Sequence, residues 1–114
     1  MNVTIYHNPR CSKSRQALAY LRERDLEPEI IRYLDDTPDV DKLKELIDAA
    51  GVTAHDAIRT REAEYAELGL SPETPEAELL AAMAQHPRLI ERPFVVTDRG
   101  VRIARPTEAI DDII

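Results

Sequence analysis

The chain contains one cysteine, few aromatic residues, more acid than base and no long apolar run. A single cysteine, Cys11, among 114 residues excludes an internal disulfide framework, an internal CxxC redox pair and a zinc site built from several thiolates. The net charge of −7 is unsuited to a general nucleic-acid binder, which needs clustered cations. An aromatic content of 4% also disfavours base stacking in a nucleic-acid groove.

No stretch is apolar for long enough to span a membrane, and the first residues show no basic segment followed by an apolar one. We therefore expect a soluble, cytoplasmic protein. The three histidines, His7, His55 and His86, lack metal-ligand spacing, and we expect no metal site. Length and a hydrophobic content of 43% fit one globular domain, and nothing demands more than a monomer.

The order of apolar and turn residues predicts an α/β fold. Strand, helix and strand at the start indicate a parallel βαβ pair, and a late hairpin adds antiparallel strands. We expect four strands in one mixed sheet flanked by helices, with an α-helical insertion between strands two and three. The expected strands include Val3–Tyr6, Ile30–Tyr33, Phe94–Thr97 and Val101–Ala104; the expected helices cover 12–25, 37–50, 55–59, 62–68, 76–85 and 106–113.

Cys11 follows the first strand at the predicted N-terminus of a helix. Its neighbours Arg10, Lys13 and Arg15 are cations, and the segment from His7 to Arg15 contains no acid. Cations and the helix dipole both favour the thiolate, which is the nucleophilic form. A buried structural cysteine is the alternative interpretation. The C-x5-R loop of phosphatases is excluded, because position 17 holds alanine.

Two arginines, Arg92 and Arg105, each precede a proline. Proline holds the preceding residue extended, and an arginine fork matches an oxyanion with two parallel hydrogen bonds. Ordinary surface turns would give the same pattern. Arg59 and Arg61 close a predicted short helix and are equally compatible with solvated charges.

Several ordered motifs resemble one family. They are His7-Asn8-Pro9-x-Cys11-x-x-Ser14-Arg15, the segment Tyr65–Leu70, the block from Gln85-His86-Pro87 through Arg92-Pro93 to Thr97, and Arg105-Pro106. Together they resemble the glutaredoxin-dependent arsenate reductase family, ArsC, over essentially the whole chain. The resemblance implies a thioredoxin-like fold and a single domain, 1–114, with a helical insertion at about 37–88.

The resemblance also implies roles for individual residues. Cys11 matches the catalytic cysteine, His7 a histidine that assists the thiol, and Ser14 a serine near the sulfur. The three arginines that hold the oxyanion correspond to Arg59, Arg92 and Arg105. The cis proline before the third strand corresponds to Pro93.

The implied reaction begins when Cys11 displaces a hydroxyl from arsenate. Glutathione, the reductant, then attacks the adduct, glutaredoxin removes the glutathione, and arsenite leaves. No bound cofactor and no nucleic-acid or membrane partner are expected. Two alternatives stay open: a thiol oxidoreductase of this family with another oxyanion or glutathione-linked substrate, and a non-catalytic module like the RNA-polymerase-binding Spx relatives. Ser14 stands where many of those relatives carry a second cysteine.

Overall fold

The computed structural model describes residues 1–91 and 93–114 and divides the chain into two compact units. The first unit joins the N-terminal segment Met1–Asp36 to the C-terminal segment that ends at Ile114, and the second unit is Thr37–Glu91. The single-domain boundaries stay a prediction. In the described part of the chain, no helix is both long and apolar enough to cross a membrane.

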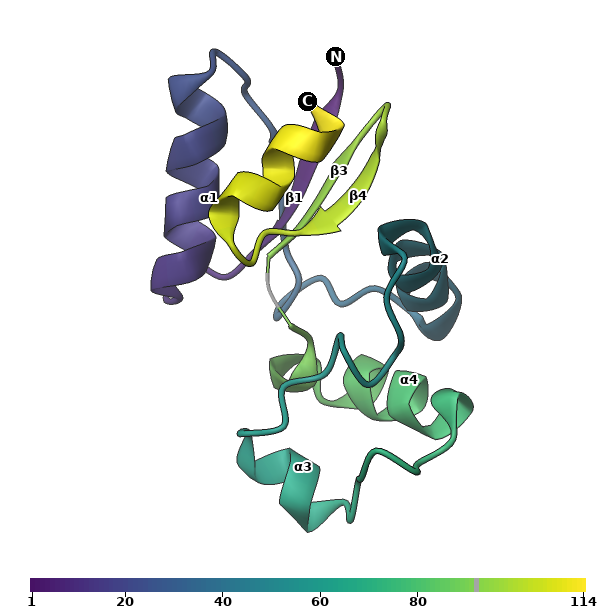
Figure 1. Ribbon diagram of the computed structural model, residues 1–114. Coiled ribbons are helices and arrows are strands. Elements are labelled where there is room, and N and C mark those ends of the chain that lie inside the picture. The colour runs from purple at the N-terminus through teal and green to yellow at the C-terminus, as the bar shows by residue number, and fades with distance from the viewer. Residues whose placement is uncertain (92) are drawn as a thin grey trace. The chain divides into compact units, whose positions relative to one another are not determined.

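The first unit is built on a four-stranded mixed sheet in the order β2-β1-β3-β4, of which β1, β3 and β4 are labelled in Figure 1. β1 pairs parallel with β2, with Ile5 opposite Ile30, and antiparallel with β3, with Ile5 opposite Val95. β3 and β4 form the predicted hairpin. The strands are β1 Val3–His7, β2 Glu29–Arg32, β3 Phe94–Thr97 and β4 Gly100–Ile103.

Two helices pack on one face of this sheet. They are α1, Ser12–Glu23, and the C-terminal 3-10 helix η2, Thr107–Ile113. The shared core is apolar and comes from β1, β3, α1 and the C-terminal segment, so α1 is fixed against the strand that leads into it. Its buried members are Val3, Ile5, Ala17, Leu21, Val95, Ala104, Ile110 and Ile113.

The second unit is helical. It contains α2 Val40–Ala50, α3 Ala63–Glu67, α4 Glu76–Gln85 and the short 3-10 helix η1 Pro87–Leu89. Gly51 ends α2 in the left-handed region, at φ +72°, where glycine carries no Cβ penalty. These helices lie between β2 and β3 in the sequence, so the predicted fold class, with its helical insertion, is confirmed.

The expected helix over 55–59 is wrong, because residues 54–57 form a turn and Ile58 forms an isolated β-bridge with Ile90. Asp56 accepts a hydrogen bond from the Thr53 N–H, and Thr53 Oγ1 accepts one from the Asp56 N–H. The Arg59 N–H then donates to the Leu89 carbonyl at 2.7 Å, which joins the chain to a segment far away in sequence. Short-range side-chain bonds and this distant partner replace the helical ladder.

Candidate active site

The predicted thiol site forms where β1 ends and α1 begins. Cys11 is the N-cap of α1, with φ −95° and ψ 124°, and its side chain makes no capping hydrogen bond. The loop is closed by the Cys11 N–H, which donates to the Asn8 carbonyl at 3.0 Å. The thiol residue is partly exposed, and the first turn of α1 contains no acid. The predicted place of Cys11, at a strand-to-helix turn, is therefore confirmed.

Behind this loop, Ser14 joins two other groups in a buried network. Its side chain is fully buried in the first turns of α1. Ser14 Oγ accepts a hydrogen bond from the Asn8 N–H at 3.0 Å and lies 2.6 Å from His7 Nδ1. If His7 Nδ1 carries the proton, the ring donates to Ser14, and the serine keeps its own proton for another acceptor. If Nε2 carries it, Ser14 donates to His7 instead.

His7 is held in its neutral form. Burial, and secondarily the positive charges of Arg32, Arg22 and Arg15, hold the pKa of His7 below its ordinary value of 6.5. A neutral imidazole can accept a proton at one nitrogen while it donates from the other. The network behind Cys11 therefore consists of neutral groups.

Four positively charged residues lie on the thiol loop, in the first turns of α1 and at the end of β2. Arg10, Lys13, Arg15 and Arg32 make no ion pair with any residue that the structure describes. Arg15 instead donates to the Pro9 carbonyl at 2.9 Å, which ties the loop to α1. Unpaired cations favour both a thiolate and a bound anion.

Arg105 lies near the start of α1. It lines a pocket of about 270 Å³ together with Lys13 and Gln16 from the first turns of that helix, and with Thr107 and Glu108. The Arg105–Pro106 peptide bond is cis. The structure thus brings one predicted oxyanion arginine to the same end of the first unit as the thiol loop.

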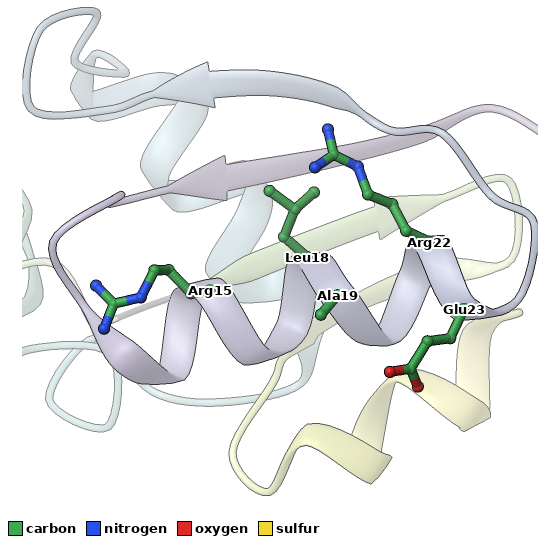
Figure 2. A pocket seen from close by; sticks show the side chains of 5 residues that line it. All are labelled: Arg15, Leu18, Ala19, Arg22 and Glu23. Carbon is green, nitrogen blue, oxygen red and sulfur yellow. The ribbon is translucent and has the colours of Figure 1, made fainter.

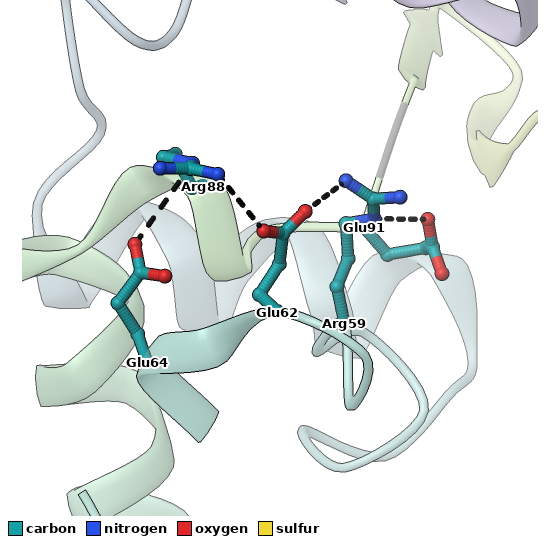
Figure 3. A network of polar contacts seen from close by, with 5 residues as sticks. All are labelled: Arg59, Glu62, Glu64, Arg88 and Glu91. Carbon is teal, nitrogen blue, oxygen red and sulfur yellow. Dashed lines mark hydrogen bonds and ion pairs between the residues drawn. The ribbon is translucent and has the colours of Figure 1, made fainter. Parts of the chain in front are cut away.

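Arg59 belongs to the second unit, where carboxylates hold it. Its guanidinium lies 2.6 Å from Glu62 Oε1 and 3.8 Å from Glu91 Oε1. Glu62 also pairs with Arg88, at 3.3 Å, and Arg88 lies 3.9 Å from Glu64 (Figure 3). The side chain of Arg59 is 24% exposed. The alternative that Arg59 is a freely solvated charge is therefore wrong, and sequence reasoning had missed its acidic partners.

Two further predicted residues stand next to each other before β3. Arg92 lies outside the described residues, and so does the peptide bond that would make Pro93 a cis proline. Pro93 itself is fully buried, and its carbonyl accepts a hydrogen bond from the Ala104 N–H at 2.9 Å. The roles of both residues stay predictions.

A groove of about 550 Å³ runs along α1 (Figure 2). Leu18 and Ala19 form its apolar part, and Arg15, Arg22 and Glu23 complete it. None of the candidate site residues that the structure describes lines it, and Arg22 is paired with Glu27 at 3.0 Å. Among the described residues, no cluster of three or more His, Cys, Asp or Glu side chains could hold a metal ion.

Sequence reasoning also missed Asn8 and Arg32. Asn8 Oδ1 accepts a hydrogen bond from the Arg10 N–H at 3.0 Å, a local turn that an asparagine before proline makes common and that could have been read from the sequence. No sequence pattern indicates Arg32. It reaches the site only because β1 pairs parallel with β2, which places Arg32 opposite His7.

Comparison with known proteins identifies the family. The ArsC family matches residues 6–113. An arsenate reductase of Rhizobium meliloti (strain 1021) is 48% identical over all of this chain and 82% of its own length, and one of Neisseria meningitidis serogroup B is 41% identical over 98% and 97%. A solved arsenate reductase from Vibrio cholerae is 43% identical, covers 100% of this chain and 98% of its own, and superposes with a TM-score of 0.95. The chain belongs to the ArsC family.

Proposed function

We propose that the protein is an arsenate reductase in which Cys11 is the nucleophile. The observation that carries the proposal is the position of Cys11: a partly exposed thiol residue at the N-terminus of α1, with no acid in the first turn of that helix, in a chain whose full length aligns with arsenate reductases. The same surroundings that favour a thiolate also attract an arsenate oxyanion.

The first step forms a bond between the Cys11 sulfur and arsenic and breaks an As–O bond, whose oxygen leaves as water. Arg105 stabilises the charge on the oxyanion through charge-assisted hydrogen bonds, and the resemblance to the family implies the same role for Arg59 and Arg92. His7 and Ser14 hold the loop that precedes Cys11 in place through the buried network that they share with the Asn8 N–H.

The second step needs an external reductant, because the chain has no other cysteine. A glutathione thiol attacks the adduct, and the sulfur–arsenic electron pair stays on arsenic. Arsenic thereby gains two electrons and leaves as arsenite, while Cys11 and glutathione share a disulfide. Thiol exchange with glutaredoxin removes the glutathione and regenerates Cys11. We assign this chemistry to the cytoplasm, where thiols are kept reduced, and to a monomer.

The test is arsenate-dependent NADPH oxidation in an assay coupled through glutathione, glutaredoxin and glutathione reductase. We expect activity in the native protein and none in Cys11→Ser. Arsenate reduction that persists in Cys11→Ser would overturn the assignment of the nucleophile. If the native protein shows no activity with glutaredoxin, thioredoxin or dithiothreitol as the reductant, the assignment of arsenate as the substrate would be overturned.

A further inference from the structure

A second pocket in the first unit, distinct from the one that Arg105 lines, lies on the thiol loop. It has a volume of about 280 Å³, and its walls come from the loop before Cys11 and from the end of β2 and the turn after it. That volume is just below the range of complete small-molecule sites, so it suits one end of a ligand. Its lining residues are His7, Asn8, Pro9, Arg10, Arg32, Leu34 and Asp35.

The charged groups of this pocket are two cations and one anion. Arg10 and Arg32 are exposed, and neither makes an ion pair with a described residue. Asp35 adds a single carboxylate. A carboxylate ligand would gain two charge-assisted partners, and an ammonium group next to that carboxylate would gain one.

His7 supplies a polar atom at the buried side. It is only 5% exposed, and its Nδ1 lies against Ser14 Oγ. No described residue forms a hydrogen bond with its Nε2. This nitrogen belongs to a side chain that lines the pocket, which is an observation independent of the two arginines. When Nε2 carries the ring proton, it can donate to an acceptor such as a carboxylate oxygen.

We propose that this pocket binds the α-amino-acid end of the thiol reductant, which in glutathione is the γ-glutamyl carboxylate and ammonium. Arg10, Arg32 and His7 Nε2 hold the carboxylate, and Asp35 holds the ammonium. Arg10 is the chain neighbour of Cys11, so a thiol on the flexible chain beyond the bound end reaches the Cys11 adduct. The pocket positions the reductant, whereas the arginines of the proposed oxyanion site bind arsenate. Only the identity of the ligand as the reductant rests on the proposed function.

Binding to Cys11→Ser, which cannot form a mixed disulfide, tests the pocket without turnover. We expect glutathione and γ-glutamylcysteine to bind with similar affinity, and cysteinylglycine, which lacks the γ-glutamyl end, to bind about tenfold more weakly. In ¹⁵N spectra, glutathione should give His7 Nε2 the shift of a hydrogen-bonded N–H. Equal binding of cysteinylglycine, or sulfate competing as well as γ-glutamylcysteine, would overturn the proposal and leave a simple anion site.

Variants of the two arginines test the same contacts. Added to Cys11→Ser, Arg32→Gln should weaken glutathione binding about threefold, and Arg10→Gln with Arg32→Gln about tenfold. Arg61→Gln, which removes an exposed arginine elsewhere, should leave it unchanged. An unchanged affinity in the double variant would contradict the proposal.

Steady-state kinetics separate this proposal from the function itself. In the chain with Cys11 intact, the double arginine variant should raise the KM for glutathione about tenfold, a larger change than in the KM for arsenate, because the two arginines contact the reductant directly and act on arsenate only through their charge. If the native protein binds glutathione through these residues but does not reduce arsenate, the proposed function fails and the pocket stands. If arsenate is reduced and the KM for glutathione does not change, the pocket fails and the function stands.

Discussion

The N-termini of α1 and α2 differ in how their ends are completed. In α2, Asp39 is the N-cap, its carboxylate accepts from the Lys42 N–H at 2.8 Å, and Asp41 adds an acid to the first turn. In α1, the N-cap is Cys11, no side chain caps the helix and the first turn has no acid. The positive end of α2 is satisfied within the chain. In α1, by contrast, no side-chain hydrogen bond caps the positive end, which fits the thiolate and the bound oxyanion that we propose there.

The largest expected effect comes from giving α1 the kind of cap that α2 has. Cys11→Asp removes the nucleophile and supplies a carboxylate to the N-terminal amides. We expect arsenate turnover to fall at least about a thousandfold, while the free energy of unfolding rises by about 1 kcal/mol. The coupled assay and urea denaturation measure the two quantities. A loss of both activity and stability would show that the thiol is a structural cap.

Ser14→Ala should have the next largest effect. The substitution leaves the buried Asn8 N–H and His7 Nδ1 without their partner, so the free energy of unfolding should fall by about 2 kcal/mol. Urea denaturation checks this, and Ser12→Ala, an exposed serine on the same helix, is the control that should change it by less than about 0.5 kcal/mol. Equal effects of the two changes would mean that the network contributes nothing.

Removing the cap of α2 should cost less and leave the chemistry alone. Asp39→Ala deletes the acceptor for the Lys42 N–H, and we expect a loss of about 1 kcal/mol with arsenate turnover unchanged. Asp39→Asn keeps a capping oxygen and should recover most of that stability in thermal unfolding. A fall in turnover as large as that of Cys11→Asp would erase the distinction between the two helix ends.

The smallest effect is a pH dependence at the buried side of the thiol site. The pKa of folded His7 lies below the ordinary 6.5, through burial and the nearby arginines. The unfolded chain therefore binds the proton more readily. The stability due to neutral His7 is complete above pH 6.5 and is lost as the pH falls through the folded pKa. His7→Gln should flatten this part of a stability–pH profile, and an unchanged slope would contradict it.

The sequence was sufficient to predict those features that depend on residues close to one another in the chain. The predicted sheet follows from the alternation of apolar residues, and the place of Cys11 follows from a strand that ends before a helix without acids in its first turn. The end of the helix expected over 37–50 is equally local, because the residue that follows it, Gly51, takes a left-handed backbone conformation that favours glycine.

Contacts between residues far apart in the sequence could not be predicted. Arg32 reaches the thiol site through strand pairing with His7, and Arg59 meets Glu91 only because its segment pairs with the chain around Ile90. The spacing around 55–59 resembled a helix, but Thr53 and Asp56 bond to each other and close a turn there. Neither the helix or strand propensity of a residue nor a short sequence motif predicts a partner that lies far away in the sequence.

One measurement tests the central claim, that Cys11 is the nucleophile of arsenate reduction, most directly. The protein is mixed with arsenate and glutathione, without glutaredoxin, and the modified residue is identified by mass spectrometry. We expect one glutathione per chain, on Cys11, formed together with an equal amount of arsenite and only when arsenate is present. Arsenite formed while Cys11 stays unmodified, or glutathione attached to Cys11 equally well without arsenate, would contradict it.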